Sequence, residues 1–329
     1  MKRSVSRSVP VWIVFLLIAA LLTACGRAPA ANPNPTGTAA SATQPGTVPA
    51  TQYPLTVTDS AGRQVTIPAK PQRILSLAPS NTEILFALGL GDEVVGTDTF
   101  SDYPEAAKSK EKVGGVIDPN PEKMLSLKPD VAFAIGGSEK QYAKLLDNGT
   151  PVVVLQPKNL EEVYATVRLV GRITDASVQA DAVVKNMQDR IATVTAKTKN
   201  LTPAQEPKVF YEVYHDPLMT VGPGSFIHDL IGLAGGQNIA ADTGKDYPQV
   251  SPELLVQKNP DIILSPYEDF LKSVRDGKYP AWAGVPAVKQ NKLYQVDDNM
   301  MSRPGPRLAD ALEQLASLIH PELFPPLAK

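Results

Sequence analysis

Two stretches of the chain share one pattern: PEKMLSLKPDV at residues 121–131 and PELLVQKNPDI at residues 252–262. In both stretches the two prolines lie eight residues apart, and so do the glutamate after the first proline and the aspartate after the second. Proline suits the first turn of a helix, and the Pro-Asp pair makes a tight turn before an apolar run. Each stretch therefore predicts a short helix followed by a buried strand, once in each half of the chain.

Short apolar runs alternate with helical patterns on both sides of this repeat. They are RILSL (73–77), VVGT (94–97), VAFAI (131–135) and VVVL (152–155), then KVFYEV (208–213), DIILS (261–265) and KLYQV (292–296). Strands that alternate with helices form a parallel sheet with helices on its faces. We therefore predict an α/β protein of two Rossmann-like three-layer lobes, at residues 55–159 and 201–329, joined by one long helix.

Several local signals fix the ends of elements. LTVTDSAGRQVTIP (55–68) alternates apolar and polar residues around a turn and predicts a hairpin. Ser80-Asn81-Thr82-Glu83 has the spacing of a capping box, which would open a helix through Leu88 that Gly89 stops. A last helix is expected to start near Pro306 and to end before Pro321.

The connection between the lobes is predicted to be helical over residues 160–200. No proline occurs between Leu160 and Asn200, and Gly171 is the only glycine there. Apolar residues recur at roughly helical spacing at Val178, Ala182, Met187, Ile191 and Val194. A helix over residues 176–199 would run ~36 Å, which is long enough to bridge two lobes and predicts a stiff hinge with small lobe motions.

The first residues of the chain have the pattern of a secretory signal. Lys2, Arg3 and Arg7 precede the apolar run VWIVFLLIAALL at residues 11–22. A transmembrane helix is the alternative, but the run is shorter than the ~20 residues needed to span a bilayer. The following LTACG (22–26) contains the only cysteine, Cys25, and resembles the lipobox of bacterial lipoproteins, in which this cysteine is lipidated and becomes the N-terminus.

These features predict a signal peptide at residues 1–24 and an extracytoplasmic protein that lipidated Cys25 anchors to the membrane. Residues 25–54 are rich in Ala, Pro and Thr, have no apolar periodicity and are predicted to form a linker.

The composition excludes several functions. The 329 residues carry 32 Lys and Arg against 34 Asp and Glu, so the chain lacks the basic footprint of a nucleic-acid partner. One cysteine excludes an internal disulfide, and three scattered histidines argue against a metal centre built from histidines. GPGSF (222–226) is not the G-x-S-x-G elbow that carries the nucleophile of many hydrolases, so a membrane-anchored hydrolase is not the favoured function. Gly89-Leu90-Gly91 lacks the third glycine of a dinucleotide-binding loop.

Residues 55–324 resemble the long-helix class of bacterial ABC-importer substrate-binding proteins, which includes cobalamin and ferric-siderophore binders. The matching motifs are residues 57–91, SDYP (101–104), NPEKMLSLKPD (120–130), YPQVSPELL (247–255) and RPGPRLADALEQLA (303–316). The resemblance implies a monomeric binding protein without enzyme activity or cofactor that delivers a small-molecule ligand to an ABC permease dimer. It also implies that Glu122 and Glu253, one on each lobe, pair with arginines of the permease. Each glutamate also fits an ordinary helix N-terminus, where a carboxylate gains about 0.3–1 kcal/mol.

Ligands of open α/β sheets bind beyond the carboxyl ends of the strands. The candidate ligand-binding residues at these ends are Ser80, Asn81, Phe100, Asp102 and Tyr103 in the first lobe, and Tyr214, His215, Tyr267, Met300, Met301 and Arg303 in the second. Aromatic and thioether side chains suit a large, flat, amphipathic ligand such as a corrinoid or haem, and Arg303 could pair with a carboxylate or phosphate on its rim.

Some of these residues also fit other roles. Tyr214 and Phe100 are equally compatible with core packing. His215 could ligate a metal in a bound macrocycle, or could form a hydrogen-bonded surface pair with Asp216.

The motifs SDYP and YPQVSPELL are closest to the cobalamin-binding branch, although Val116 stands where that branch has a Trp and Phe100 where a Tyr is usual. We therefore predict a lipid-anchored receptor for cobalamin or a related corrinoid, with a ferric siderophore or haem as the alternative ligand.

Overall fold

The structure is a computed structural model that describes residues 50–325. The predicted signal peptide, Cys25 and nearly all of the predicted linker lie outside the described residues. The described residues belong to one compact unit. Within them, no helix has the length and the apolar character needed to span a membrane.

The first lobe opens with the predicted hairpin, in which β1 (Leu55–Thr58) pairs antiparallel with β2 (Gln64–Ile67). A parallel sheet and its connecting helices follow. In chain order they are β3 (Ile74–Ser76), α1 (Pro79–Ala87), β4 (Val94–Thr97), the 3₁₀ helix η1 (Glu105–Ser109), α2 (Pro121–Ser126), β5 (Val131–Ala134), α3 (Ala143–Asp147) and β6 (Val152–Val154). The strand order of this sheet is β4-β3-β5-β6, and every neighbouring pair is parallel.

The second lobe repeats this plan and adds to it. It holds β7 (Lys208–His215), β8 (Leu218–Thr220), α6 (Phe226–Leu233), β9 (Gln237–Asn238), α7 (Glu253–Lys258), β10 (Ile262–Ser265), α8 (Glu268–Arg275), η2 (Pro280–Gly284), α9 (Pro286–Lys289), β11 (Leu293–Gln295), α10 (Asp298–Ser302) and α11 (Leu308–Ile319). The strands β9, β7, β10 and β11 are parallel neighbours in that order, and β8 pairs antiparallel with β7.

The sequence repeat occupies the same place in both sheets. It forms α2 and β5 in the first lobe and α7 and β10 in the second, so each copy ends in the strand next to the first strand of the lobe's main sheet, β3 or β7. Asp130 accepts hydrogen bonds of 2.9 Å from the backbone N–H groups of Gln72 and Arg73, and Asp261 accepts one of 2.9 Å from that of Lys208. The Pro-Asp turn thus holds the start of β3 in the first lobe and of β7 in the second, the same structural role in both lobes.

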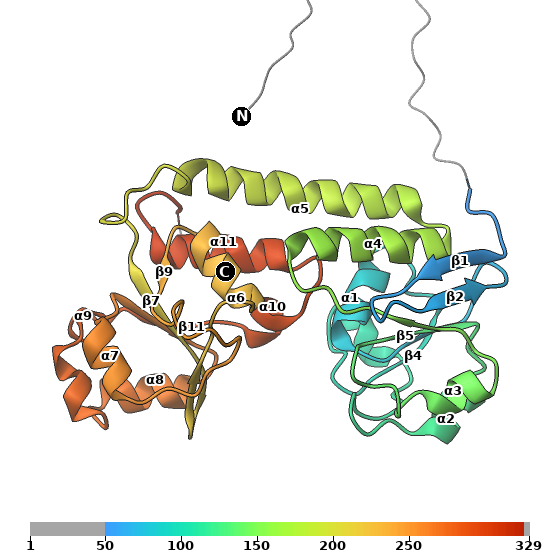
Figure 1. Ribbon diagram of the computed structural model, residues 1–329, viewed down its shortest axis with the longest axis horizontal. Coiled ribbons are helices and arrows are strands. Elements are labelled where there is room, and N and C mark those ends of the chain that lie inside the picture. Colours follow the sequence, from blue (N-terminus) through green and yellow to red (C-terminus); the bar gives the residue numbers. More distant parts are fainter. Residues whose placement is uncertain (1–49, 326–329) are drawn as a thin grey trace, which may run out of the picture. The chain divides into compact units, whose positions relative to one another are not determined.

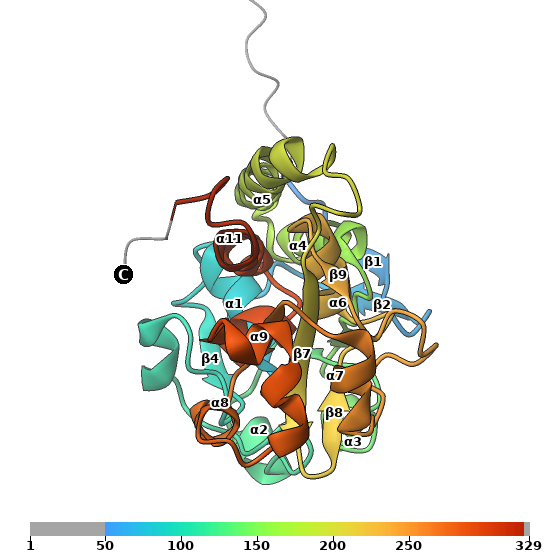
Figure 2. The ribbon, with the colours of Figure 1, turned by 90° about the vertical axis from the view of Figure 1, so that its left-hand side faces the viewer.

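Two helices connect the lobes, α4 (Leu160–Thr174) and α5 (Ser177–Thr198). The predicted long helix over residues 176–199 is confirmed to within one residue at each end. Figures 1 and 2 show α5 lying along α4 and α11, and it contacts both helices. Arg190 on α5 donates hydrogen bonds to Asp310 and Glu313 on α11. The bridging helix therefore packs on α4 and is also tied by Arg190 to α11 of the second lobe.

The two lobes share one hydrophobic core. It includes Ile74 and Val131 from the first sheet, Val209 and Ile262 from the second, and the buried faces of α4, α5 and α11. The opposite face of each sheet has a separate, smaller core, beneath α2 and α3 in the first lobe and beneath α8 and η2 in the second. Because separating the lobes would expose part of the shared core, its burial opposes large rearrangements of the lobes.

The predicted capping box at Ser80–Glu83 is wrong. Helix α1 begins at Pro79 with Ala78 as its N-cap, and no side chain caps it. Ser80 is buried inside the first turn, and the Glu83 carboxylate binds arginines of the second lobe. The predicted stop is correct, because α1 ends at Ala87 and Gly89 has a φ of 78°, which suits glycine best.

Candidate ligand-binding site

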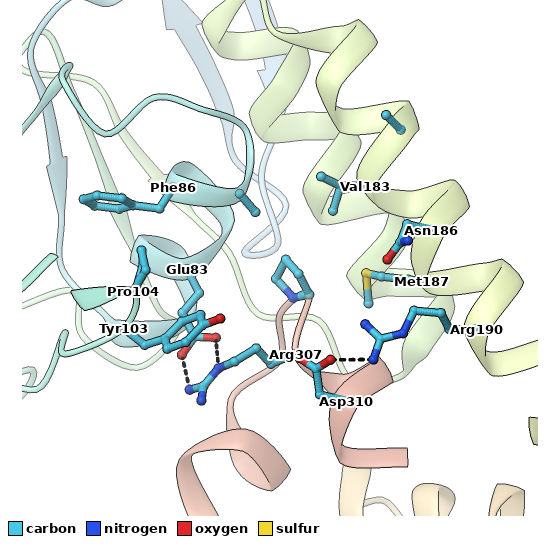
Figure 3. Close-up of a pocket in the computed structure, with 13 residues that line it drawn as sticks. Glu83, Phe86, Tyr103, Pro104, Val183, Asn186, Met187, Arg190, Arg307 and Asp310 are labelled. Atoms are coloured by element: carbon cyan, nitrogen blue, oxygen red, sulfur yellow. Dashed lines mark hydrogen bonds and ion pairs between the residues drawn. The ribbon is translucent and has the colours of Figure 1, made fainter. Parts of the chain in front are cut away.

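The loops after the strands of both lobes meet at a cross-lobe ion cluster. This cluster consists of Glu83 and Asp102 from the first lobe and Asp297, Arg303 and Arg307 from the second. Arg307 binds Glu83 through two atoms, with Nε 2.8 Å from Oε2 and Nη2 2.6 Å from Oε1 (Figure 3). Arg303 places Nη1 3.1 Å from Glu83 Oε1 and 2.8 Å from Asp102 Oδ1. The two lobes are therefore joined by charged hydrogen bonds at their strand ends.

Burial makes this cluster energetically important. The side chain of Glu83 is 2% exposed, and those of Arg303 and Arg307 are 11% and 12% exposed. A buried charge that loses its partner costs about 3–5 kcal/mol. Burial raises the pKa of Asp102, but the hydrogen bond and charge of Arg303 outweigh it, so the pKa lies below its ordinary value. The hydrogen bonds of the cluster hold the loops of the two lobes together.

A cavity of about 530 Å³ lies beside the Glu83–Arg307 pair, between α1, α5 and the start of α11. Figure 3 shows Phe86, Val183 and Met187 on its walls and the Arg190–Asp310 pair on the far side from Tyr103. The cavity lies on the flank of the molecule next to the bridging helix, because α5 forms one of its walls.

Aromatic rings gather at the end of β7 and β10 in the second lobe. The rings of Tyr214 and His215 stack with centroids 5.5 Å apart, and Tyr267 meets His215 edge-on at 5.7 Å. Phe270 stacks on the other side of His215 at 6.1 Å. Tyr214 and Tyr267 are 47% and 38% exposed, so this group presents aromatic surface to solvent.

A buried carboxylate lies beneath His215. Glu212 is fully buried, and its Oε2 accepts a 2.5 Å hydrogen bond from Ser265 Oγ. Its Oε1 lies 3.6 Å from His215 Nδ1, and neither atom has a hydrogen-bond partner among the described residues. Burial raises the pKa of Glu212, and the smaller effects of Ser265 and His215 oppose the rise. The carboxyl group that faces the His215 ring is thus that of Glu212 rather than that of the expected Asp216.

The remaining predicted site residues fall into two groups. Phe100 and Tyr103 are 60% and 45% exposed, and Phe100 and Asp102 both contact Arg303. Ser80, Asn81 and Met301 are buried, Met301 within the shared core, while Met300 is half-buried against it. The structure thus brings Phe100, Asp102 and Arg303 together, whereas Ser80, Asn81 and Met301 do not reach the surface.

Sequence reasoning missed three residues of this region. Glu83 was assigned only to a cap, Arg307 was given no role, and Tyr247, which is 47% exposed, was not named. The RPGPR motif could have drawn attention to Arg307, because its two arginines are separated by two prolines and a glycine, which is unusual for a helix start. In the part of the chain that the structure describes, no group of three or more His, Cys, Asp or Glu side chains could hold a metal ion.

The two predicted docking glutamates both lie in the first turn of a short helix, as expected. Glu122 is exposed and pairs with Lys144 at 2.6 Å, and this hydrogen bond lowers the pKa of Glu122. Glu253 has no ion-pair partner among residues 50–325, and hydrogen bonds from its own backbone N–H and from Ser251 lower its pKa. The glutamates are equivalent in the fold but differ in their surroundings.

Comparisons with known proteins agree with this geometry. Residues 74–300 match the family model of periplasmic binding proteins. The chain is 36% identical over 321 residues to the uncharacterized ABC transporter substrate-binding lipoprotein YvrC of Bacillus subtilis (strain 168), covering 95% of this chain and 98% of that protein. It is 31% identical to a vitamin B12-binding protein of Vibrio vulnificus (strain CMCP6), covering 76% and 91% of the two chains.

A solved structure has the same fold. The periplasmic heme-binding protein RhuT of Roseiflexus sp. RS-1 superposes with a TM-score of 0.68 at 29% identity, covering 76% of this chain and 98% of that one. The family model covers more than half of the chain, which confirms the class that the motifs indicated. The chain therefore belongs to the periplasmic binding protein family and is an extracytoplasmic substrate-binding protein of the ABC-transporter type, not an enzyme.

Proposed function

We propose that this protein is a lipid-anchored receptor that captures cobalamin or a related corrinoid and delivers it to an ABC permease. The observation that carries the proposal is the exposed aromatic surface at the strand ends of both lobes. It consists of Phe100 and Tyr103 in the first lobe and Tyr214, Tyr247 and Tyr267 in the second. The corrinoid is cargo, and the protein acts as a monomer without a cofactor of its own.

Exposed aromatic rings on a soluble surface have a physical cost that a ligand would remove. Large apolar side chains are exposed between 38% and 60% at these five positions. Such side chains mark binding sites when they gather beside polar groups, because a flat ligand buries them while its rim stays hydrogen-bonded. A corrinoid has a broad apolar ring face and polar arms, and so fits this combination.

The relatives support a tetrapyrrole-like ligand but differ in which one they name. One relative is named for vitamin B12 and one neighbouring structure for heme. His215 favours haem as the second candidate, because its ring borders the exposed aromatic group and its Nδ1 faces the Glu212 carboxylate at 3.6 Å. A carboxylate behind an imidazole fixes the ring so that the other nitrogen can ligate a metal. Haem, whose iron has axial positions free, would then use His215, whereas a six-coordinate corrinoid would not need it.

Differential scanning fluorimetry distinguishes these ligands. We expect cyanocobalamin and cobinamide at 100 times their dissociation constants to stabilise the protein by about 2.7 kcal/mol, seen as a rise in Tm of several degrees. A rise with haem or ferric siderophores and none with either corrinoid would contradict the corrinoid proposal. Replacing His215 by Ala separates the two further, because it would abolish the haem response and leave the corrinoid response intact.

The lipid anchor requires its own test. Cells that express the protein are expected to incorporate labelled fatty acid into it and to retain it in the membrane fraction. The Cys25→Ser variant would lose both properties. Release of the unchanged protein into the soluble extracytoplasmic fraction would contradict anchoring.

A further inference from the structure

The arginine expected to bind the ligand rim is already occupied. Arg303 donates from Nη1 to Glu83 and Asp102, and from Nη2 to the Phe100 carbonyl at 3.2 Å and to Asn299 Oδ1 at 2.7 Å. A guanidinium has five N–H groups, so these four bonds leave one for other partners. Arg303 is therefore bound by residues of both lobes rather than open to an anion.

The second arginine of the RPGPR motif is occupied as well. Arg307 binds both carboxylate oxygens of Glu83, its Nη2 reaches the Asn299 carbonyl at 3.4 Å, and its Nη1 lies 3.8 Å from Asp297. The ring of Tyr103 covers the guanidinium at 4.1 Å. Two-point pairing of this kind is among the strongest contacts between side chains. A ligand carboxylate would have to displace Glu83 to reach Arg307.

The charges that remain near the surface are negative. Asp102 and Asp297, with side chains 49% and 52% exposed, are the outer members of the cluster. A hollow of about 500 Å³ at the ends of β10 and β11 is lined by Pro266, Gln295, Val296, Asp297, Asp298 and Asn299. These lining residues include two carboxylates and no cation. Burial, and to a smaller extent the neighbouring Asp297, raise the pKa of Asp298, while Arg303 and the Ser302 hydroxyl oppose the rise.

We call the exposed aromatic rings at the strand ends, together with the hollow lined by residues 295–299, the strand-end surface. We propose that this surface selects ligands whose rim carries carboxamides or other uncharged hydrogen-bond donors and rejects ligands whose rim carries carboxylates. The proposal rests on the corrinoid function above and specifies its chemical class. A carboxamide N–H can be accepted by Asp297 or by the side-chain oxygens of Gln295 and Asn299. A carboxylate meets like charges there, and the donors that it needs are bound to Glu83 and Asp102.

This selectivity distinguishes two kinds of planar ligand that the aromatic surface alone would not distinguish. A corrinoid with amidated side chains offers many neutral donors around its ring, whereas haem carries two carboxylates. The aromatic rings of Tyr214 and Tyr267 would stack on either macrocycle. The polar residues around them would then decide which one is retained.

A matched pair of corrinoids tests the proposal. Titration calorimetry of the purified protein at pH 7 would compare dicyano-cobyrinic acid with the same ring after all its carboxyl groups are amidated. We expect the amide to bind at least about tenfold more tightly, a difference of about 1.4 kcal/mol. Equal binding, or tighter binding of the acid, would overturn the proposal.

A second pair keeps the two proposals distinguishable. If neither corrinoid binds, the corrinoid function is wrong, and haem is compared with its dimethyl ester instead. Preference for the ester would uphold the charge selectivity on another ring, and preference for free haem, or no binding of either, would overturn it.

Two single substitutions test whether the strand-end carboxylates cause the preference for the amide. Asp297→Asn keeps a side-chain oxygen that can still cap α10 but removes a charge, and is expected to reduce the amide preference severalfold. Asp189→Asn, which removes an exposed carboxylate on α5, is the control and should leave the preference unchanged. An equal effect of both variants, or of neither, would show that the strand-end carboxylates do not select the ligand.

Discussion

The first helix of each lobe follows a strand of its main sheet, β3 before α1 and β8 before α6, yet the two helices begin in different ways. In the second lobe Ser225 caps α6 by accepting a 3.2 Å hydrogen bond from the His228 N–H group. In the first lobe no side chain caps α1, although Ser80 and Glu83 have the spacing of a capping box. The Glu83 carboxylate binds Arg303 and Arg307 instead. A local motif can thus lose its local role when a stronger partner lies across a domain boundary.

The lobe tips differ in a similar way. The two copies of the repeat place Glu122 and Glu253 in equivalent first turns, but within residues 50–325 only Glu122 has an ion pair, with Lys144. A repeated supersecondary unit therefore specifies position and leaves the electrostatic surroundings to residues outside the repeat. The following predictions test these differences between the lobes.

The largest effect is expected at the carboxylate that joins the lobes. Glu83→Gln removes the charge that two nearly buried guanidinium groups share, and we expect the free energy of unfolding to fall by about 3–5 kcal/mol. Asp102→Asn, at a half-exposed member of the same cluster, should cost no more than about 1 kcal/mol. Urea denaturation of both variants measures the difference. Equal losses would mean that the cross-lobe cluster does not depend on Glu83.

The docking glutamates give the next largest effect. We expect the double variant Glu122→Arg with Glu253→Arg to reduce ligand uptake at least about tenfold in cells that contain the permease, while ligand affinity stays unchanged. Of the single variants, Glu253→Arg should reduce uptake more, because Lys144 already pairs with Glu122. Asp189→Arg on α5 serves as the control for added positive charge. Normal uptake by the double variant would contradict docking through these residues.

The helix caps should differ by a smaller amount. Ser225→Ala removes the cap of α6 and is expected to cost about 1 kcal/mol. Ser80→Ala removes no cap and should cost less, since Ser80 makes no capping hydrogen bond. Thermal unfolding of the two variants under identical conditions compares them, and a larger loss for Ser80→Ala would show that α1 depends on that hydroxyl.

The smallest effect concerns the buried carboxylate beneath His215. Burial raises the pKa of Glu212 above its ordinary value of 4.5. Its contribution to stability is therefore complete below pH 4.5, where both folded and unfolded states are protonated, and is lost as the pH rises through the folded-state value. We expect Glu212→Gln to remove this loss, so that its stability relative to the natural protein increases from pH 4.5 to 8. A relative stability that falls with pH would contradict the raised pKa.

Much of the fold is predictable from sequence because it depends on periodic patterns and on proline and glycine. The strands at residues 131–134 and 262–265, the bridging helix and the stop at Gly89 all follow from such local rules. The core shared by the two lobes did not follow, because the apolar residues of each strand do not show which helices cover them.

The candidate site was only partly predictable. Strand ends identified Phe100, Asp102, Tyr214 and Tyr267, which are exposed, but the same rule selected Met301, which is buried in the shared core. The pairing of Glu83 with Arg303 and Arg307 joins residues about 220 positions apart. No local sequence pattern predicts such a contact. Because of this contact, Arg303 is bound by residues of both lobes and is not open to a ligand anion as expected.

Titration calorimetry of the purified protein with cyanocobalamin tests the central claim most directly. The account predicts a single binding site, with affinity at least about tenfold weaker in the Tyr214→Ala variant, because that ring supplies stacking surface from the second lobe. Absence of binding to cyanocobalamin, together with binding of haem or a ferric siderophore, would contradict it.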